Sequence, residues 1–344
     1  MQSLFMRVLF YSTKHFEKQY LDAHNKQGRS IHFTAEMLSL ATVEMARGYD
    51  VISIFANDDA SAPVINALSK GGTKHIAIRA AGFDNVDIAA ANEEDIIVAN
   101  VPDYSPNAIA EHAVLLMLAL NRKIILANEQ VTRRDFTLDK LIGFDLNEKV
   151  VGIVGTGKIG KIVARILHGF GCTIIAYDPE EDQSLMNRYD VHYVDLGTIY
   201  SQADIITLHL PLRKETAFMI NESSIRQMKR GVMLINTARG GIVKTEKVLD
   251  ALENGKIGYF GMDVYEKEKG VFFHDHSNSL FQDTLLERLI EHPNVIVTPH
   301  QAFATSQALT NIAATTFQSI DTWVTDGLSQ HELTFRRHSE RLVS

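Results

Sequence analysis

One stretch near the middle of the chain, residues 149–160 (KVVGIVGTGKIG), constrains the fold more than any other part of the sequence. Residues 150–154 are predicted to form a buried strand, because β-branched side chains crowd it and a glycine-rich turn follows. Gly155, Gly157 and Gly160 then spell G-x-G-x-x-G. In such a turn the first glycine allows a tight bend, the second lets backbone approach a pyrophosphate, and the third lets a helix pack closely on the sheet.

A second strand and an acidic residue complete this pattern. Residues 172–178 follow the expected helix as an apolar strand that ends on Asp178. The helix N-terminus presents free N–H groups to phosphate, and an acid at this place accepts the ribose hydroxyls of NAD. Strand, glycine turn, helix, strand and acid together predict dinucleotide binding. NAD is expected rather than NADP, because Asp178 and the acidic residues 180–182 would repel a 2′-phosphate.

The same turn almost fits a second phosphate-binding motif. Gly152 to Lys158 matches G-x-x-x-x-G-K, but Ile159 stands where a P-loop needs a Ser or Thr hydroxyl for magnesium. An ATPase or GTPase would lack this metal ligand, so we reject that interpretation. No metal is expected elsewhere, because the spacing of the histidine-rich loop 274–276 matches no compact metal site.

Length, charge and cysteine content limit the class of protein. With 344 residues the chain is large for a single core, so two domains are expected. The formal net charge of −8 argues against nucleic acid or an anionic membrane as the main partner. The longest apolar run, 113–120, is too short to span a bilayer, and Arg7 interrupts the N-terminal apolar stretch, so no secretion signal is expected. The single cysteine, Cys172, precludes an internal disulfide, and a cytoplasmic protein is expected.

Short apolar runs alternate with amphipathic segments, which predicts parallel sheets covered by helices on both faces. Before the glycine motif, we expect strands at residues 4–10, 30–33, 51–55, 75–78 and 96–99, with helical segments at 14–21, 41–47, 63–69 and 86–91. After it, strands are expected at 205–208, 232–236, 258–263 and 295–298. A helix at 304–321 should pack back on the first domain, and the polar residues from about Gln330 should form a loose tail.

The segment 102–106 (PDYSP) is the expected hinge, since Ser105 can cap and Pro106 can open a long helix through Asn121. The chain is therefore predicted to be an α/β protein with two doubly wound parallel-sheet domains. A flavodoxin-like substrate domain would comprise residues 1–102 and 301–344. A Rossmann NAD-binding domain would comprise residues 103–300.

A short list of candidate residues follows the expected strands, at the carboxyl ends where open α/β sheets bind ligands. They are Asp178, Pro211, residues 237–240, Asp263, Glu266, Glu268 and His300. Beside NAD, this set suits hydride transfer on a hydroxy or oxo acid. A cation clamps the carboxylate, an imidazole moves the hydroxyl proton, and an acid keeps the imidazole charged. Each residue also has an ordinary interpretation, such as a surface arginine for Arg239 and a solvated loop for Glu268.

Four motifs make the chain resemble the D-2-hydroxyacid dehydrogenase family over nearly its whole length. They are GTGKIG at 155–160, NTARG at 236–240, MDVYE at 262–266 and TPHQAF at 298–303. Within that family, YSTK at 11–14, AGFDNVD at 81–87 and FFHD at 272–275 are most similar to the fermentative D-lactate dehydrogenases. The L-lactate dehydrogenases differ, because they carry their glycine motif near the N-terminus.

The resemblance implies a role for each site residue. Arg239 would bind the substrate carboxylate, Glu268 would pair with the imidazole, and His300 would be the catalytic acid and base. The residues implied to contact NAD are Gly155, Gly157, Lys158, Ile159, Gly160, Asp178, Leu210, Pro211, Thr216, Thr237, Ala238, Arg239 and Asp263.

The reaction implied by the resemblance is the reversible reduction of pyruvate to D-lactate with NADH. Backbone N–H groups of Ala81 and Gly82 would hold the carboxylate from the other domain, and Tyr104 would line the pocket. A homodimer or a dimer of dimers is also implied, and the apolar helix at 113–120 suits a core or a subunit interface.

Two alternatives stay open. The first is the same chemistry on a bulkier D-2-hydroxy acid, which Phe55, Tyr104 and Phe303 would crowd if they face the pocket as the resemblance implies. The second is a non-catalytic NADH-sensing scaffold, as in the related C-terminal binding protein corepressors. Those proteins retain the dehydrogenase residues, but the present chain shows no evident interaction tail.

Overall fold

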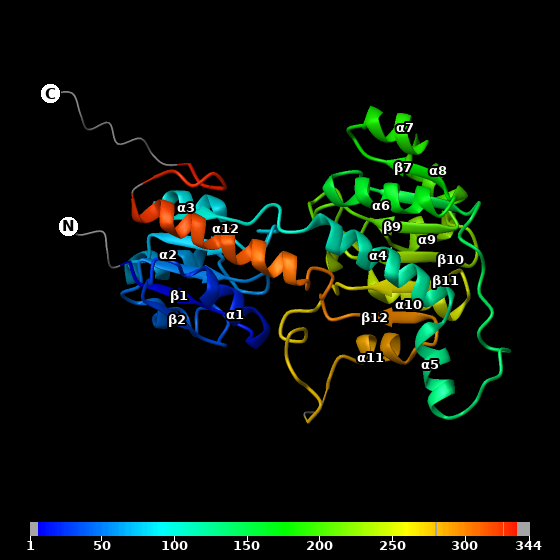
Figure 1. Ribbon diagram of the computed structural model, residues 1–344, viewed down its shortest axis with the longest axis horizontal. Helices are drawn as coiled ribbons and strands as arrows, with labels where there is room; N and C mark the ends of the chain where they lie inside the picture. Colours follow the sequence, from blue (N-terminus) through cyan, green and yellow to red (C-terminus); the bar gives the residue numbers. More distant parts are fainter. Residues whose placement is uncertain (1–5, 279–280, 326, 336–344) are drawn as a thin grey trace. The chain divides into compact units, whose positions relative to one another are not determined.

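The computed structural model describes residues 6–278, 281–325 and 327–335, and the chain forms two compact units (Figure 1). Unit 1 comprises Met1–Ser105 and Ala304–Ser344, and unit 2 comprises Pro106–Phe303. Each unit contains its own parallel β-sheet with helices on both faces. The predicted fold class is confirmed.

Within the described residues, the sheet of unit 1 contains five parallel strands in the order β2-β1-β3-β4-β5, which is the flavodoxin-like order. The strands are β1 (Val8–Phe10), β2 (Ile31–Phe33), β3 (Val51–Ile54), β4 (His75–Ile78) and β5 (Ile97–Ala99). Each coincides with an expected strand, and Leu4 and Phe5 of the first expected strand lie outside the described residues.

Helices cover both faces of this sheet because its side chains alternate. On β1, Val8 and Phe10 pack with the face covered by α1 (His15–His24) and α12 (Ser306–Val324). Leu9 packs with the opposite face, which carries α2 (Ala62–Gly71), α3 (Ile88–Glu93) and the 3₁₀ turn η1 (Val43–Ala46). In place of the helix expected at 41–47, the structure contains only this 3₁₀ turn. The turn ends shortly before Gly48, whose φ of 78° lies in the left-handed region.

The expectation of a loose tail from Gln330 was wrong for the described residues 330–335. The Leu333 N–H donates to the Val98 carbonyl at 2.7 Å, and the Val98 N–H donates to Thr334 Oγ1 at 3.0 Å. Glu332 forms an antiparallel bridge with Ala99. The segment thus covers the outer edge of β5, whose backbone groups would otherwise be unpaired. Polar composition alone could not reveal this pairing, and residues 336–344 lie outside the described residues.

A buried ion pair sits at the carboxyl ends of the unit 1 strands. Arg79 directly follows β4, and its Nε and Nη2 donate to the Glu17 carboxylate of α1 at 3.0 and 3.1 Å. Its guanidinium also donates to Ser53 Oγ at 3.0 Å and to the Tyr11 carbonyl at 2.8 Å. The pair therefore ties three neighbouring strands to one helix.

The described part of unit 2 contains a seven-stranded parallel sheet in the order β12-β11-β10-β9-β6-β7-β8. Its strands are β6 (Val150–Val154), β7 (Thr173–Tyr177), β8 (His192–Tyr193), β9 (Ile205–Leu208), β10 (Val232–Asn236), β11 (Ile257–Met262) and β12 (Val295–Val297). The two-residue strand β8 was not expected, because it is too short to give an apolar pattern. The chain runs outward from β6 to β8 and then returns to β9 beside β6, which makes the switch point of a Rossmann sheet.

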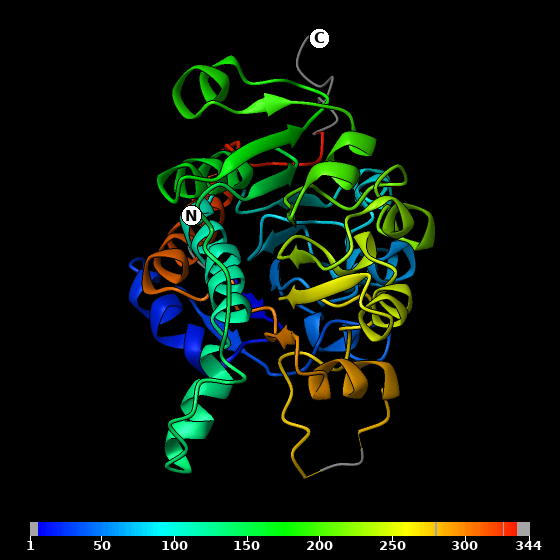
Figure 2. The same cartoon turned by 90° about the vertical axis from the view of Figure 1, so that its right-hand side faces the viewer.

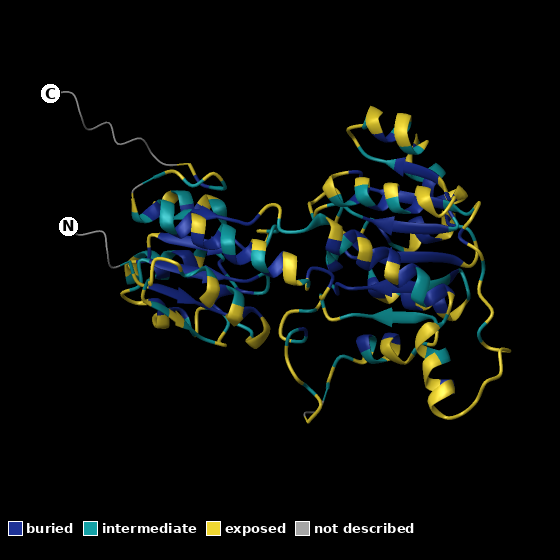
Figure 3. Cartoon of the chain, in the orientation of Figure 1, coloured by how far each residue is buried: buried dark blue, intermediate teal, exposed yellow. Residues whose placement is uncertain are grey.

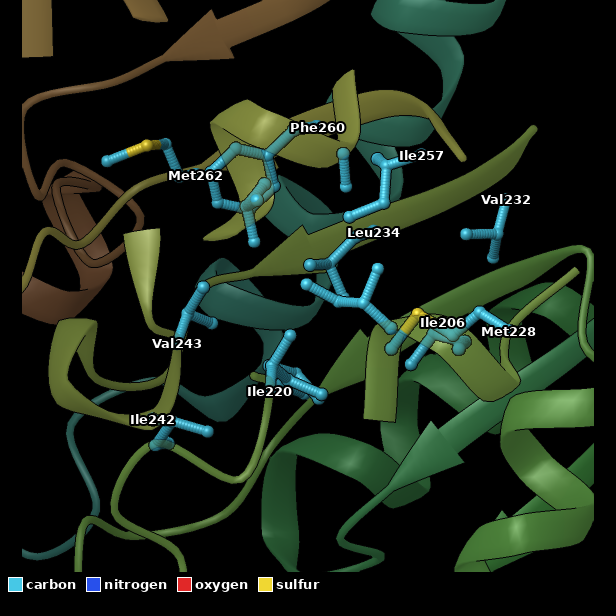
Figure 4. Close-up of a cluster of buried hydrophobic side chains, with 14 of the residues drawn as sticks. Ile206, Ile220, Met228, Val232, Leu234, Ile242, Val243, Ile257, Phe260 and Met262 are labelled. Atoms are coloured by element: carbon cyan, nitrogen blue, oxygen red, sulfur yellow. The ribbon is translucent and has the colours of Figure 1, made fainter. Parts of the chain in front are cut away.

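Two hydrophobic cores lie on the two faces of this sheet. On one face pack α4 (Pro106–Asn121), which has the expected bounds, and α6 (Lys158–Gly169). The opposite face packs with α8 (Leu196–Gln202), α9 (Glu222–Gln227), α10 (Thr245–Glu253) and α11 (Thr284–Glu291). Figure 4 shows part of this second core, in which Ile206, Leu234 and Phe260 come from three adjacent strands.

Helix α5 (Ile124–Thr132) extends away from the sheet of unit 2 (Figure 2) and is largely exposed (Figure 3). The short helix α7 (Gln183–Tyr189) lies between β7 and β8 along the chain. Among the described residues, no helix is long and apolar enough to cross a membrane.

Candidate active site

The candidate residues of unit 2 follow six adjacent strands of its sheet. Because these strands are parallel, their carboxyl ends lie along one edge. From one side of that edge to the other, the residues are Asp178 after β7, Gly155 after β6, Leu210 and Pro211 after β9, Thr237, Ala238 and Arg239 after β10, Asp263 after β11, and His300 after β12. The fold thus brings the glycine turn and the charged residues to the same edge.

The glycine turn leaves open space where a phosphate would need it. Gly155 has a φ of 94°, and a Cβ on it would lie 2.4 Å from the His209 carbonyl oxygen. A Cβ on Gly160 would lie 2.0 Å from the Gly155 carbonyl oxygen. A Cβ on Gly157 would meet no atom within 4 Å among the described residues, and α6 begins at the next residue. Gly155 and Gly160 are therefore required because a side chain at either position would clash with the backbone. Gly157 has no side chain to block the N-terminus of α6, which stays accessible to an anion.

Two further polar groups suit a bound dinucleotide. The Asp178 carboxylate accepts the Thr156 N–H at 2.7 Å and the Glu180 N–H at 3.0 Å, so it is held beside the glycine turn. Thr237 Oγ1 is buried and has no hydrogen-bond partner within the described part of the chain. A buried hydroxyl without a partner is costly, and a ligand at this edge could supply one. The residues present therefore fit NAD.

His300 and Glu268 form an ion pair at this edge. His300 Nδ1 lies 2.9 Å from Glu268 Oε1, and the other carboxylate oxygen accepts the Tyr265 N–H at 3.1 Å. The side chains of His300 and Glu268 are 18% and 17% exposed. Because Glu268 engages Nδ1, Nε2 is the ring nitrogen available for proton transfer to a substrate. The fold thus joins two candidate residues that lie 32 positions apart in the sequence.

Two phenylalanine rings flank the imidazole of His300. The ring centroids of Phe273 and Phe303 lie 5.8 and 6.4 Å from the centroid of the imidazole. His300 has a φ of 55° and Phe273 a φ of 67°, a left-handed backbone conformation that side chains disfavour. Such strained residues persist only where the surrounding structure imposes them, and they cluster at functional sites.

Asp263 supplies part of that surrounding structure. Its carboxylate accepts the Thr298 hydroxyl at 2.6 Å and the N–H groups of Gln301 and Ala302 at 2.8 and 2.9 Å. Its carbonyl accepts the His300 N–H at 2.8 Å. Burial raises the pKa of Asp263, and the hydrogen bond from Thr298 acts in the opposite direction. Asp263 was singled out as an NAD contact, and the structure shows that it also holds the turn around His300.

Arg239 directly follows β10, the strand between β9 and β11. Its Nη1 donates to the Ala238 carbonyl at 2.8 Å, and its own carbonyl accepts from Asn236 Nδ2 at 3.0 Å. Thr216 braces the loop after β9, because its hydroxyl donates to the Pro211 carbonyl at 2.7 Å. Both residues thus lie on segments that begin at the carboxyl edge.

Three predicted substrate contacts lie in unit 1. Ala81 follows β4, and its carbonyl accepts from Asn100 Nδ2 at 2.7 Å, which fixes the peptide that joins it to Gly82. The Tyr104 carbonyl accepts from Asn311 Nδ2 at 2.7 Å. The roles of Ala81, Gly82 and Tyr104 toward a substrate stay predictions.

Sequence reasoning missed His112, which lies on the buried face of α4 and contacts the Thr298 hydroxyl at 3.0 Å. Its only signal was a histidine at the start of an otherwise apolar helical stretch. A histidine in that setting is as readily a core residue as part of a site. For the described residues, no group of three His, Cys, Asp or Glu side chains could hold a metal ion.

Comparison with known proteins gives this arrangement a family. Residues 114–302 match the model of the D-isomer specific 2-hydroxyacid dehydrogenase, NAD binding domain. The D-lactate dehydrogenase of Escherichia coli strain K12 is 44% identical over 316 residues, which cover 92% of this chain and 96% of that protein. This chain belongs to the D-isomer specific 2-hydroxyacid dehydrogenase family. It is an NAD-dependent oxidoreductase of that family, and unit 2 contains its NAD-binding domain.

Solved structures of other family members match almost the whole of this dehydrogenase. The pyruvate reductase of Chlamydomonas reinhardtii is 42% identical with a TM-score of 0.88, covering 96% of this chain and 99% of that one. A D-lactate dehydrogenase of Aquifex aeolicus, complexed with NAD and lactic acid, is 30% identical with a TM-score of 0.86. That match covers 95% of this chain and 99% of the other.

Proposed function

We propose that this family member catalyses the reversible reduction of pyruvate to D-lactate with NADH. The observation that carries the proposal is the His300–Glu268 pair, which lies on the same sheet edge as Arg239 and the open glycine turn. The similarity to a D-lactate dehydrogenase and to a pyruvate reductase supports pyruvate as the substrate.

The side chains divide the chemistry among them. When bound, the nicotinamide supplies the hydride that reaches the carbonyl carbon. Arg239 pairs with the substrate carboxylate through two parallel N–H bonds, which fix orientation as well as charge. Protonated His300 donates its Nε2 proton to the carbonyl oxygen as negative charge develops there. Glu268 accepts the Nδ1–H bond, so it orients the ring with Nε2 available to the substrate.

We assign the cofactor contacts in the same way. The pyrophosphate would meet Gly157 and the N-terminus of α6, and Asp178 would accept the ribose hydroxyls, which excludes a 2′-phosphate. The remaining proposed NAD contacts are Gly155, Lys158, Ile159, Gly160, Leu210, Pro211, Thr216, Thr237, Ala238, Arg239 and Asp263.

The test is oxidation of NADH and of NADPH by the wild-type protein, measured with a panel of 2-oxo acids of increasing side-chain size and with chiral analysis of the product. We expect the highest kcat/KM with pyruvate and NADH, and D-lactate as the product. A higher kcat/KM with a bulkier acid would contradict pyruvate as the substrate. Tight NADH binding without turnover of any acid would favour the NADH-sensing scaffold instead.

We also propose that the protein is a homodimer or a dimer of dimers. The arm of residues 124–145, formed by α5 and the segment after it, carries apolar side chains that are 52–75% exposed. They are Ile124, Ile125, Val131, Phe136, Leu138 and Ile142. A cluster of exposed apolar side chains on one segment is typical of an interaction site, and a second copy of the chain offers a matching arm.

Sedimentation velocity of the wild type and of Phe136→Ser/Leu138→Ser tests this assembly. We expect an oligomer for the wild type at micromolar concentration and a shift to monomer for the double variant. Leu328→Ser is a matched control, because Leu328 is 71% exposed but lies outside the arm. A wild type that sediments only as a monomer would reject the proposal.

A cytoplasmic location is proposed as well. The only cysteine, Cys172, is buried, and burial raises its pKa to about 11, so its thiol is poorly reactive. A chain that forms no internal disulfide suits a reducing compartment. Fractionation of cells that produce the untagged protein tests this, and recovery in a secreted or membrane fraction would contradict it.

A further inference from the structure

A chain of hydrogen bonds links α4 to the turn that carries His300. His112 Nε2 lies 3.0 Å from Thr298 Oγ1 and 3.6 Å from Asp263 Oδ1. Thr298 Oγ1 in turn lies 2.6 Å from the same Asp263 oxygen. The side chains of His112 and Asp263 are 9% and 1% exposed, so water competes little for these contacts.

The number of protons available sets the direction of each bond. Both oxygens of Asp263 accept backbone N–H bonds, from Gln301 and Ala302, and these bonds favour the charged form of the carboxylate against the burial that raises its pKa. A charged carboxylate only accepts, and the Thr298 hydroxyl has a single proton, so Thr298 donates to Asp263. The Thr298 oxygen then accepts from His112, which requires a hydrogen on Nε2. Burial lowers the pKa of His112, and the charge of Asp263 acts in the opposite direction, so near neutral pH the ring is neutral. Because the bond to Thr298 requires the hydrogen on Nε2, this neutral ring is the Nε2–H tautomer.

The end of this chain is the backbone of the catalytic turn. Asp263 holds the N–H groups of residues 301 and 302 through its carboxylate and that of His300 through its carbonyl. These bonds surround a residue at a φ of 55°, a conformation that a histidine does not adopt unless it is imposed. The orientation of the Asp263 carboxylate therefore bears directly on where the His300 ring lies.

We propose that His112 is a positioning residue for this reaction. Its Nε2–H donates to the Thr298 oxygen, so the Thr298 hydroxyl donates to the Asp263 carboxylate. This bond fixes the orientation of the carboxylate, which in turn holds the backbone turn that carries His300. Nothing in the described residues places His112 against His300 itself, so it acts through the other two. The kinetic part of this inference rests on the proposed function, whereas the tautomer of His112 can be measured without any substrate.

The first experiment measures the tautomer in the wild-type protein. With histidine ring nitrogens labelled with ¹⁵N, long-range proton–nitrogen correlation spectra distinguish Nε2–H from Nδ1–H rings, and His112→Gln assigns the signal. We expect a neutral ring with its hydrogen on Nε2 near neutral pH. A hydrogen on Nδ1 alone would overturn the proposal, whether or not the protein reduces pyruvate.

The second experiment compares His112→Leu with His112→Gln. Leucine fills a similar volume without a donor, whereas the glutamine amide can place an N–H near the position of Nε2. With the 2-oxo acid that the wild type reduces fastest, we expect kcat to fall about tenfold in His112→Leu, as for one lost hydrogen bond to a polar network. His112→Gln should stay within about threefold of the wild type, because the donor is kept. Equal losses in both variants would show that His112 serves packing alone.

The third experiment asks whether His112 acts through Thr298. If it does, adding His112→Leu to Thr298→Val should lower kcat little further than Thr298→Val alone. Losses that multiply independently would overturn the proposed route. The control is His168→Leu, which removes an exposed histidine of α6 and should keep wild-type kcat. Thermal unfolding and NADH fluorescence verify that each variant is folded, and the wild-type tautomer decides the proposal if His112→Leu does not fold.

Discussion

Both units of this dehydrogenase have an ion pair at the carboxyl ends of their parallel strands, Arg79–Glu17 in unit 1 and His300–Glu268 in unit 2, and the two pairs differ in access to solvent. In unit 1, the side chains of Arg79 and Glu17 are 0% and 5% exposed. In unit 2, those of His300 and Glu268 are 18% and 17% exposed. Both pairs join elements that are distant in sequence, so position in the fold alone does not separate a structural pair from a reactive one.

What separates them is how the polar atoms are used. Arg79 directs its guanidinium to Glu17, Ser53 and the Tyr11 carbonyl, all within the protein. His300 uses only Nδ1 to bind Glu268, its backbone is strained, and its side chain remains partly accessible to solvent. The comparison indicates that the sealed pair stabilises the fold, whereas the accessible pair performs chemistry. Substitutions at Arg79, Arg239, Glu268 and His300 test this distinction.

The largest effect is expected for His300→Gln. Removing the general acid should lower kcat for pyruvate reduction by about 10²–10⁴-fold. Because the ring is partly exposed, the midpoint of chemical unfolding should hardly change. Stopped-flow and steady-state kinetics measure the first quantity, and urea titration measures the second. Retention of more than a tenth of wild-type kcat would remove His300 from the catalytic role.

Arg79→Met should produce the opposite pattern. It leaves the buried Glu17 without its partner, so we expect the free energy of unfolding to fall by about 3–5 kcal/mol. The folded fraction should still bind NADH, because the cofactor contacts assigned above lie in unit 2. Arg79→Met/Glu17→Leu is the control, since replacing both charges should recover much of the stability. Loss of kcat in Arg79→Met without loss of stability would invalidate the comparison.

Arg239→Lys tests the substrate side of the accessible edge. Lysine keeps the positive charge but loses the two parallel N–H bonds, so the carboxylate is oriented less well. We expect kcat/KM for pyruvate to fall by about 10²-fold, with both a higher KM and a lower kcat. NADH affinity, measured by fluorescence, should stay near the wild-type value. Unchanged pyruvate kinetics would exclude Arg239 as the carboxylate ligand.

Glu268→Gln should have the mildest effect, because the glutamine side-chain oxygen can still accept the Nδ1–H bond that orients the His300 ring. Loss of the charged partner weakens this bond, so we expect kcat for pyruvate reduction to fall by about tenfold or less. Steady-state kinetics measure this change. A loss as large as that of His300→Gln would contradict an orienting role for Glu268.

Much of the fold could be predicted from the sequence, because buried parallel strands are continuous apolar runs. Strands such as Val232–Asn236 and the helix Pro106–Asn121 have the expected bounds. The short strand His192–Tyr193 carries no such pattern. The covering of β5 by Leu333 depends on backbone pairing between distant residues, which composition does not encode.

The candidate site was predictable where a motif follows a strand. His300 lies in one such motif and Glu268 lies two residues beyond another, and the structure shows them in contact. The contacts that hold this part of the site in place were not predictable from the sequence. His112 reaches Thr298 across the packing of α4 on the sheet, and Phe273 reaches His300 through a loop with a left-handed residue. Both contacts depend on tertiary geometry rather than on local spacing.

The location of α12 has a consequence for synthesis of the chain. Phe317 and Trp323 of this helix fill the same core as Val8 and Phe10 of β1, although about three hundred residues separate them. On a ribosome, the part of this face that α12 covers must therefore stay exposed while the whole of unit 2 is made. Unit 2 is continuous in sequence and can complete its core earlier. The N-terminal strands are thus the part of the nascent protein with the longest exposure to aggregation and to chaperones.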